Sequence, residues 1–304
     1  MREPGAPAFL NRVPAPLPPR FAGHRSDLIV QAPALPRAVV DTLAARIGAA
    51  AIEPIAGGGP TAFRLTAVAP GSDVAAACAG LDADCALLPA GLARSDVRVL
   101  AMDMDSTLIT IECIDEIADL QGIKSQVAAI TASAMRGEID FRESLARRVR
   151  LLAGLPVAAL ERVYVERLRL SPGAEAMLAG FRAAGARLLL VSGGFTFFTD
   201  RLRDRLGFDD VAANVLDIVD DRLSGRITGE IVDAQAKAGR LLALREQHVV
   251  DGGLTVAIGD GANDLPMLAV ADVSIAYRAK PVVRAQATLA LDHCGLDALL
   301  NLFP

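Results

Sequence analysis

Short runs of apolar residues recur along residues 96–304 and alternate with segments in which apolar residues follow a helical spacing. Apolar runs without polar alternation are typical of strands buried on both faces of a parallel sheet. We expect such strands at VRVLAMD (97–103), ARLLLVSGG (186–194), VAAN (211–214), TVAIGD (255–260), VSIA (273–276) and TLAL (288–291). The pattern predicts an α/β fold built on a doubly wound parallel sheet.

Two inserts interrupt this alternation. Residues 112–172 are rich in helix formers, with charged residues at helical spacing, and we expect them to form a helical cap over the sheet. The segment LDIVDDRLSGRITG (216–229) predicts a β-hairpin that turns between Asp220 and Gly225. The second domain is therefore expected to span residues 96–304.

A smaller α/β domain is expected at residues 26–95. Its pattern predicts strand, helix, strand, helix and strand, at LIVQA, PRAVVDTLAARIGAA, TAFRLTAVA, SDVAAACAGL and CALLP. It contains no cluster of catalytic residue types, so we interpret it as a regulatory or assembly module. Residues 1–25 hold several prolines and arginines but no apolar core of a secretory signal, which predicts a flexible tail.

Composition narrows the class of protein. The 304 residues are 52% hydrophobic and 22% charged, as in globular proteins, and no apolar run reaches the roughly 18 residues of a membrane span. The net charge of -5 and the lack of a basic block argue against a nucleic-acid partner. Four scattered cysteines without a C-x-x-C pair predict reduced thiols in a cytoplasmic protein.

Four polar clusters follow or lie near the ends of predicted strands. They are DMDST at 103–107, SGG at 192–194, Lys237 in a helical segment, and GDGANDLPML at 259–268. Ligands of open α/β sheets bind at the carboxyl ends of the strands, so we expect these clusters to meet in one crevice. Each cluster alone has an ordinary explanation as a helix cap, a tight turn or a solvated lysine. Their joint placement favours a functional site.

The acidic residues in these clusters indicate a metal. Asp103, Asp105 and Asp260, with Asp264 behind them, supply carboxylate oxygens of the kind that hard cations prefer. Two like charges one residue apart are costly unless a cation or a shared proton compensates them. The composition of the cluster therefore predicts Mg²⁺.

The order D-x-D-S-T, S-G-G, lysine, G-D-G-x-N-D resembles that of the haloacid dehalogenase-like phosphatases. More narrowly, DMDSTLITIECIDEIA, FRESLARRV, VSGGF and VAIGDGANDLPML resemble the phosphoserine phosphatase family, over about residues 97–300. The resemblance implies that O-phospho-L-serine is the substrate, hydrolysed in the last step of L-serine biosynthesis. Residues 26–95 resemble an ACT-like domain only in their order of strands and helices. The resemblance also implies a homodimer.

The resemblance assigns the catalytic and metal-binding residues by position. It implies that Asp103 is the nucleophile, which forms an aspartyl-phosphate, and that Asp105 is the general acid and base. It places Asp103, Asp105 and Asp260 around Mg²⁺. Since an ordinary aspartic acid has a pKa of about 3.9, the second role requires burial and a nearby carboxylate to raise the pKa of Asp105 toward neutrality.

The same resemblance assigns the substrate-binding residues. Ser192, Gly193 and Lys237 would hold the phosphoryl group, and Asn263 and Asp264 would support the phosphate, the lysine and the metal waters. In the cap, Glu112 would meet the substrate ammonium and Arg148 its carboxylate, while Met135 and Phe141 would form an apolar wall. Without these motifs, a helical glutamate and an arginine in SLARRVRLL would be interpreted as solvated charges.

Two alternatives remain open at this point. The chain could be a related phosphatase or phosphotransferase that acts on phosphothreonine, phosphohomoserine or another small phosphate ester, because the covalent step is shared. It could instead be a ligand-sensing regulatory protein with an N-terminal domain that binds an amino acid and an inactive phosphatase core. The intact carboxylates, Lys237 and Asn263 argue against the second alternative.

Overall fold

The computed structural model describes residues 26–57, 59–69, 72–249 and 252–304, and the predicted tail at 1–25 lies outside them. The described residues form two compact units. One holds the residues up to Ala101 together with Pro172–Leu188 and Leu241–Pro304. The other holds Met102–Ser171 and Leu189–Arg240. The expected domain boundary near residue 95 stays a prediction.

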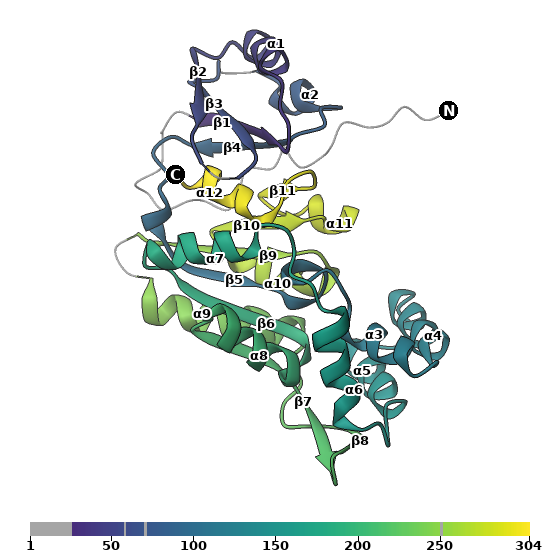
Figure 1. Cartoon of the computed structure of the whole chain (residues 1–304). Coiled ribbons are helices and arrows are strands. Elements are labelled where there is room, and N and C mark those ends of the chain that lie inside the picture. Colours follow the sequence, from purple (N-terminus) through teal and green to yellow (C-terminus); the bar gives the residue numbers. More distant parts are fainter. Residues whose placement is uncertain (1–25, 58, 70–71, 250–251) are drawn as a thin grey trace, which may run out of the picture. The chain divides into compact units, whose positions relative to one another are not determined.

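The first part of the chain forms a four-stranded antiparallel sheet with two helices (Figure 1). Its elements are β1 Ser26–Ala32, α1 Arg37–Ile47, β2 Ala51–Ile55, β3 Thr61–Thr66, α2 Val74–Cys78 and β4 Asp84–Pro89. The strand order β2-β3-β1-β4 is that of the β-α-β-β-α-β, ferredoxin-like motif. Its core contains Leu28 and Val30 of β1, Leu65 of β3, and Val40 and Leu43 of α1.

Strand β2 is absent from the sequence-based prediction, which gave three strands in this region. Its sequence AIEPI contains Pro54, and every residue of the strand is at least partly exposed. Proline lacks the N–H that a central strand needs, and β2 is an edge strand whose one partner among the described strands is β3. The strand therefore lacks the apolar run by which the others were recognised.

The remaining strands form one seven-stranded sheet in the order β11-β10-β9-β5-β6-β7-β8. They are β5 Val97–Met102, β6 Arg187–Phe195, β7 Asp210–Val219, β8 Arg222–Thr228, β9 Leu254–Gly259, β10 Val273–Tyr277 and β11 Leu289–Leu291. Without β8, this is the doubly wound order, whose switch point lies between β5 and β9. The predicted fold class is confirmed.

The predicted VAAN strand and hairpin are parts of one feature. Strand β7 continues through both segments and pairs with β8 in antiparallel register. Asp220 and Asp221 form the turn with φ angles of 51° and 59°. A two-residue turn with positive φ at both positions matches the twist of the strands that it joins. The hairpin runs alongside α5 (Figure 1).

The insert after β5 is helical, as its spacing predicted. It contains α3 Cys113–Leu120, α4 Lys124–Met135, α5 Phe141–Arg150 and α6 Val157–Arg162. Asp140 caps α5 by accepting the Glu143 N–H at 2.8 Å. The role of this helical insert as a cap over the sheet stays a prediction.

Five further helices connect the strands of the large sheet, and a sixth, α12, follows the last strand. They are α7 Ala174–Ala183, α8 Thr196–Leu206, α9 Ala234–His248, α10 Leu265–Val270, α11 Pro281–Arg284 and α12 Leu299–Leu302. None of the helices in the described ranges is both long and apolar enough to cross a membrane.

Candidate active site

The centre of the candidate site is a buried ion pair. Asp103 directly follows β5, and the Nζ atom of Lys237 donates to its Oδ1 atom at 2.7 Å. The side chains are 6% and 1% exposed, respectively. Removing both charges from water is costly, so a pair of this kind requires close contact between the opposite charges. The contact with Lys237 offsets part of the cost of burying the Asp103 carboxylate.

Asp233 fixes the start of the helix that carries Lys237. Its Oδ1 atom accepts the N–H groups of Gln235 and Ala236, at 3.1 and 3.0 Å. Its backbone carbonyl accepts the Lys237 N–H at 3.0 Å. These contacts satisfy donors in the first turn of α9, which would otherwise lack partners, and so they set the position of Lys237.

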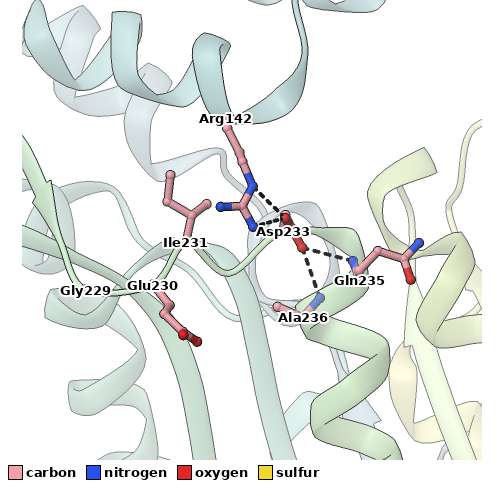
Figure 2. Close-up of a pocket in the computed structure, with 7 residues that line it drawn as sticks. All are labelled: Arg142, Gly229, Glu230, Ile231, Asp233, Gln235 and Ala236. Carbon is pink, nitrogen blue, oxygen red and sulfur yellow. Dashed lines mark hydrogen bonds and ion pairs between the residues drawn. The ribbon is translucent and has the colours of Figure 1, made fainter.

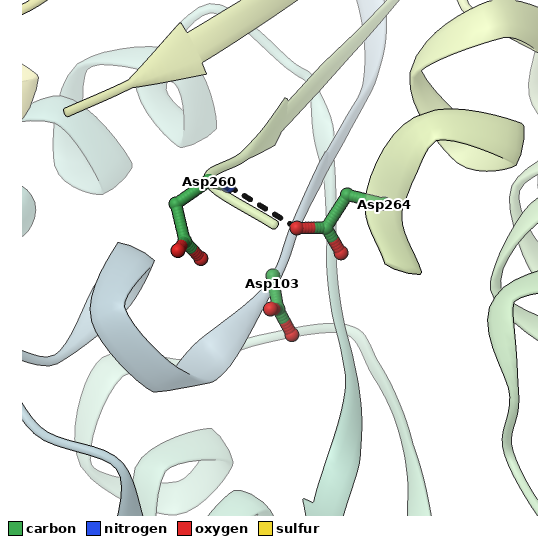
Figure 3. Close-up of side chains that lie close together, drawn as sticks. All are labelled: Asp103, Asp260 and Asp264. Atoms are coloured by element: carbon green, nitrogen blue, oxygen red, sulfur yellow. Dashed lines mark hydrogen bonds between the residues drawn. The ribbon is translucent and has the colours of Figure 1, made fainter. Parts of the chain in front are cut away.

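Three carboxylates form a group that could hold a metal ion. Oxygen atoms of Asp103, Asp260 and Asp264 lie within 4.8 Å of one another (Figure 3). The Oδ2 atom of Asp264 also accepts the N–H groups of Asp260 and Gly261, at 3.1 and 3.0 Å, which fixes the loop after β9. An all-oxygen donor set with three negative charges fits a hard divalent cation. Asp264, expected to act behind the metal ligands, thus lies among the candidate ligands.

The glycines of this loop permit its close packing. A Cβ atom on Gly259 would lie 2.6 Å from the Asp264 side chain, and one on Gly261 would clash with Oδ1 of Asn263. Any larger residue would displace these side chains. Asn263 itself donates to Oδ1 of Asp264 at 3.5 Å.

Asp105 has a different environment from Asp103. Its Oδ1 atom accepts the N–H of Cys113, at the start of α3, at 2.9 Å. Burial raises the pKa of Asp105 to about 7, and the negative charge of Glu112 adds a smaller effect in the same direction. The hydrogen bonds from Cys113 and the positive charge of Lys237 oppose the rise. Asp105 therefore binds and releases a proton near neutral pH, whereas the nearby Asp103 is paired with Lys237.

The loop between these aspartates and α3 folds back on itself. Ser106 has a φ of 56°, in the left-handed region, and its N–H donates to the Ile111 carbonyl at 3.2 Å. Its hydroxyl donates to Oε1 of Glu112 at 2.8 Å. The reversal places Glu112, which is exposed, within electrostatic range of Asp105.

The end of β6 approaches the same region. A Cβ atom on Gly194 would lie 2.8 Å from Oδ2 of Asp105, and one on Gly193 would lie 3.0 Å from the ring of Phe141. Ser192 is 1% exposed, and its Oγ atom accepts the Gly194 N–H at 2.8 Å. The structure therefore brings the SGG segment together with Asp105 and Phe141.

Arg148 on α5 faces three acidic groups. Burial lowers the pKa of Arg148, and the negative charges of Asp115, Glu112 and Asp105 oppose this change. Met135, at the end of α4, is 74% exposed. An exposed methionine is suited to line an apolar binding surface, but its proposed place in a wall with Phe141 stays a prediction.

Arg142 and Asn214, near the site, were not predicted as functional residues from the sequence motifs. Arg142 donates to Oδ2 of Asp233 through Nη2 at 2.6 Å and through Nε at 3.0 Å (Figure 2). This ion pair borders an open pocket of about 730 Å³, lined by Arg142 and by residues of 229–236. Asn214 was recognised only as part of a strand, although a polar residue ending the buried run VAAN is itself an indication of function.

Comparisons with known proteins identify the family of the chain. The family model of haloacid dehalogenase-like hydrolases matches residues 100–269. A phosphoserine phosphatase of Polaromonas sp. is 53% identical over 216 residues, covering 69% of this chain and 92% of that protein. The crystal structure of a probable phosphoserine phosphatase from Vibrio cholerae, without ligand, has a TM-score of 0.78 and 35% identity, covering 91% of this chain and 86% of that one.

A solved complex of a phosphoserine phosphatase with bound substrate is also similar. Its TM-score is 0.63 at 34% identity, and the match covers 68% of this chain and 99% of that one. The sequence relative and the family model both cover more than half of the chain. The chain is therefore a hydrolase that belongs to the phosphoserine phosphatase family of the haloacid dehalogenase-like hydrolases.

Proposed function

We propose that this chain is a Mg²⁺-dependent phosphoserine phosphatase, which hydrolyses O-phospho-L-serine to L-serine and phosphate in the last step of L-serine biosynthesis. One observation carries the proposal. Two carboxyl groups one residue apart lie in different environments, because Asp103 is paired with the Lys237 ammonium while burial raises the pKa of Asp105 to about 7. Different environments of two carboxyl groups support one role as nucleophile and one as acid.

In the proposed first step, a carboxylate oxygen of Asp103 attacks phosphorus in line. The new O–P bond forms as the bond between phosphorus and the serine oxygen breaks, and Asp105 donates its proton to that oxygen. The N–H groups of Lys237 and the O–H group of Ser192 donate hydrogen bonds to the phosphoryl oxygens and so stabilise their negative charge. The resulting aspartyl-phosphate retains the phosphoryl group while L-serine leaves.

In the second step, Asp105 acts as the base. It takes a proton from a water molecule, whose oxygen attacks phosphorus and releases the Asp103 carboxylate and inorganic phosphate. The proton state of Asp105 is thereby restored. We propose that Asp103, Asp260 and Asp264 hold Mg²⁺. We also propose Asp105 as a metal-binding residue, as the resemblance implies. When bound, the ion neutralises charge between the nucleophile and the phosphate.

Selection of the serine part of the substrate is assigned to the helical insert. Arg148 offers paired N–H donors to a carboxylate, and Glu112 offers a negative charge to an ammonium. The negative charge of Glu112 acts on Arg148, so the two side chains lie within electrostatic range of each other. This supports a site that binds both the ammonium and the carboxylate of the substrate. Phe141, which packs over Gly193, supports an apolar wall beside the phosphate site.

The test is a phosphate-release screen over small phosphate esters, with Mg²⁺ and with EDTA. We expect the highest kcat/KM with O-phospho-L-serine and Mg²⁺. Asp103→Asn should abolish both turnover and the aspartyl-phosphate seen by mass spectrometry of acid-quenched protein. Asp204→Asn, at an exposed position on α8, is the matched control and should leave both unchanged. Preference for O-phospho-L-threonine, or turnover by Asp103→Asn, would contradict the proposal.

We further propose that residues 26–95 are an ACT-like regulatory or assembly domain and that the chain forms a homodimer. The ferredoxin-like strand order of this region supports the first statement. Isothermal titration of the full chain with L-serine tests ligand binding, and light scattering tests the oligomeric state. A monomer that does not bind L-serine would leave the domain without either proposed role.

A further inference from the structure

Asn214 on β7 connects two segments of the candidate phosphate site. It is completely buried, and both ends of its side-chain amide are hydrogen bonded. Its Nδ2 atom donates to the carbonyl of Gly193 at 2.8 Å. Its Oδ1 atom accepts the N–H of Val232, also at 2.8 Å. One segment contains Ser192, and the other leads into the helix that carries Lys237.

The pairing of β6 with β7 explains why a side chain is needed at this position. The two strands pair in parallel up to Val191 and Ala212, and the register then shifts before Phe195 lies opposite Asn214. Four steps along β6 therefore correspond to two steps along β7. Extra residues in a bulged strand lose regular ladder partners, and a carbonyl that is partly shielded from water then needs another donor. Asn214 supplies that donor to Gly193.

The hydrogen bond to Gly193 also orients Ser192. The peptide between Gly193 and Gly194 is trans, so its carbonyl and its N–H point in opposite directions. With the carbonyl held by Asn214, the N–H donates to Oγ of Ser192 at 2.8 Å. A hydroxyl that accepts this bond keeps its own hydrogen for donation to a phosphoryl oxygen. Asn214 thus influences the direction in which Ser192 donates.

The other end of the amide acts on the lysine segment. Val232 directly precedes Asp233, which caps α9 and accepts the N–H of Lys237 through its carbonyl. Holding the Val232 N–H therefore limits movement of the start of α9. Asn214 binds both the segment of Ser192 and the segment that leads to Lys237, so it influences the distance between these two residues. This distance matters because both residues are assigned to the phosphoryl group.

We propose that Asn214 is a positioning residue for phosphate binding, which fixes the Gly193–Gly194 peptide and the Lys237 segment at one spacing. This inference rests on the proposed phosphatase function. An amide is required, because it offers a donor to the Gly193 carbonyl and an acceptor to the Val232 N–H at the same time. An ionised aspartate offers only acceptors and would place an oxygen against the Gly193 carbonyl.

The test compares Asn214→Asp and Asn214→Ser with the same substitutions at Asn301. Asn301 is buried on α12, in the other compact unit, and its Nδ2 atom donates to Oε1 of Gln31 at 2.9 Å. The matched variants control for a buried charge or a lost buried amide. Isothermal titration with inorganic phosphate in the presence of Mg²⁺ measures phosphate affinity, and thermal unfolding measures stability. kcat and KM are measured with O-phospho-L-serine.

We expect the Kd for inorganic phosphate to rise by about tenfold or more, and kcat to fall, in both Asn214 variants. The Asn301 variants should lose thermal stability but keep the wild-type Kd and kcat. Wild-type phosphate affinity in a folded Asn214 variant would overturn the inference, because a purely structural role changes stability alone. If Asn214→Asp does not fold, Asn214→Ser, which introduces no charge, decides the result.

The failure of the proposed function gives a different result. If the wild type binds inorganic phosphate but does not hydrolyse O-phospho-L-serine, the proposed substrate is wrong. The dependence of the phosphate Kd on Asn214 then still tests the positioning role. Full turnover by the wild type, with equal phosphate affinity in all variants, would overturn only the inference about Asn214.

Discussion

The raised pKa of Asp105 should make the stability of the metal-free protein depend on pH in a way that Asp105→Asn removes. In the unfolded chain this carboxyl group ionises near its ordinary pKa of 3.8, whereas in the folded chain it ionises near 7. The folded state therefore binds more protons between these two values, and its stability falls as pH rises through this interval. Asparagine can still accept the Cys113 N–H but does not titrate.

The size of the effect follows from the pKa shift. A rise from 3.8 to about 7 corresponds to about 4 kcal/mol, at about 1.4 kcal/mol per pH unit. The side chain of Asp105 is only half-buried, so solvent screens its charge. The expected contribution to the free energy of unfolding is therefore roughly 2–4 kcal/mol. Stabilisation of the wild type by the protonated carboxyl is complete below pH 3.8 and lost above about pH 7.

The assay is urea unfolding followed by circular dichroism, in EDTA, at several values from about pH 4.5 to about pH 8. We expect the free energy of unfolding of Asp105→Asn to rise relative to that of the wild type across this range and to level off above about pH 7. Asp204→Asn, at an exposed position, controls for the loss of an ordinary carboxylate. A pH-independent difference between Asp105→Asn and the wild type would refute the raised pKa and the assignment of Asp105 as the acid.

Three further predictions test neighbouring contacts. Lys237→Met removes the ammonium from buried Asp103 and should lower the free energy of unfolding of the metal-free protein by about 3–5 kcal/mol; a loss below about 1 kcal/mol in urea unfolding would be typical of an exposed pair instead. Gly194→Ala places a Cβ atom 2.8 Å from Oδ2 of Asp105 and should abolish phosphate release. The control Gly239→Ala, with open space at its Cβ, should keep the wild-type rate. Equal rates of phosphate release by the two variants would show that the loop adapts. Arg148→Ala should lower kcat/KM for O-phospho-L-serine by about tenfold or more relative to p-nitrophenyl phosphate, and equal losses on both would disprove a role in carboxylate recognition.

Much of the large sheet could be predicted because burial on both faces leaves a local record in the sequence. Each of its long central strands contains a run of apolar residues, and the polar motifs lie in the last residues of these strands or directly after them. The edge strand β2 left no such record, since its residues contact solvent and Pro54 interrupts the pattern. Local periodicity therefore reports the burial of an element and not its mere existence.

The sequence by itself determined the doubly wound fold, the helical insert and the motif residues, because each follows from neighbouring positions in the chain. Only the tertiary structure decided which of these residues meet. Lys237 bonds to an aspartate 134 positions away, and Asn214 bonds to backbone groups 21 and 18 positions away. The pKa of Asp105 likewise depends on burial and on the Glu112 charge, which the loop reversal at Ser106 brings near. Such contacts depend on strand order and register, which no local pattern of residues specifies.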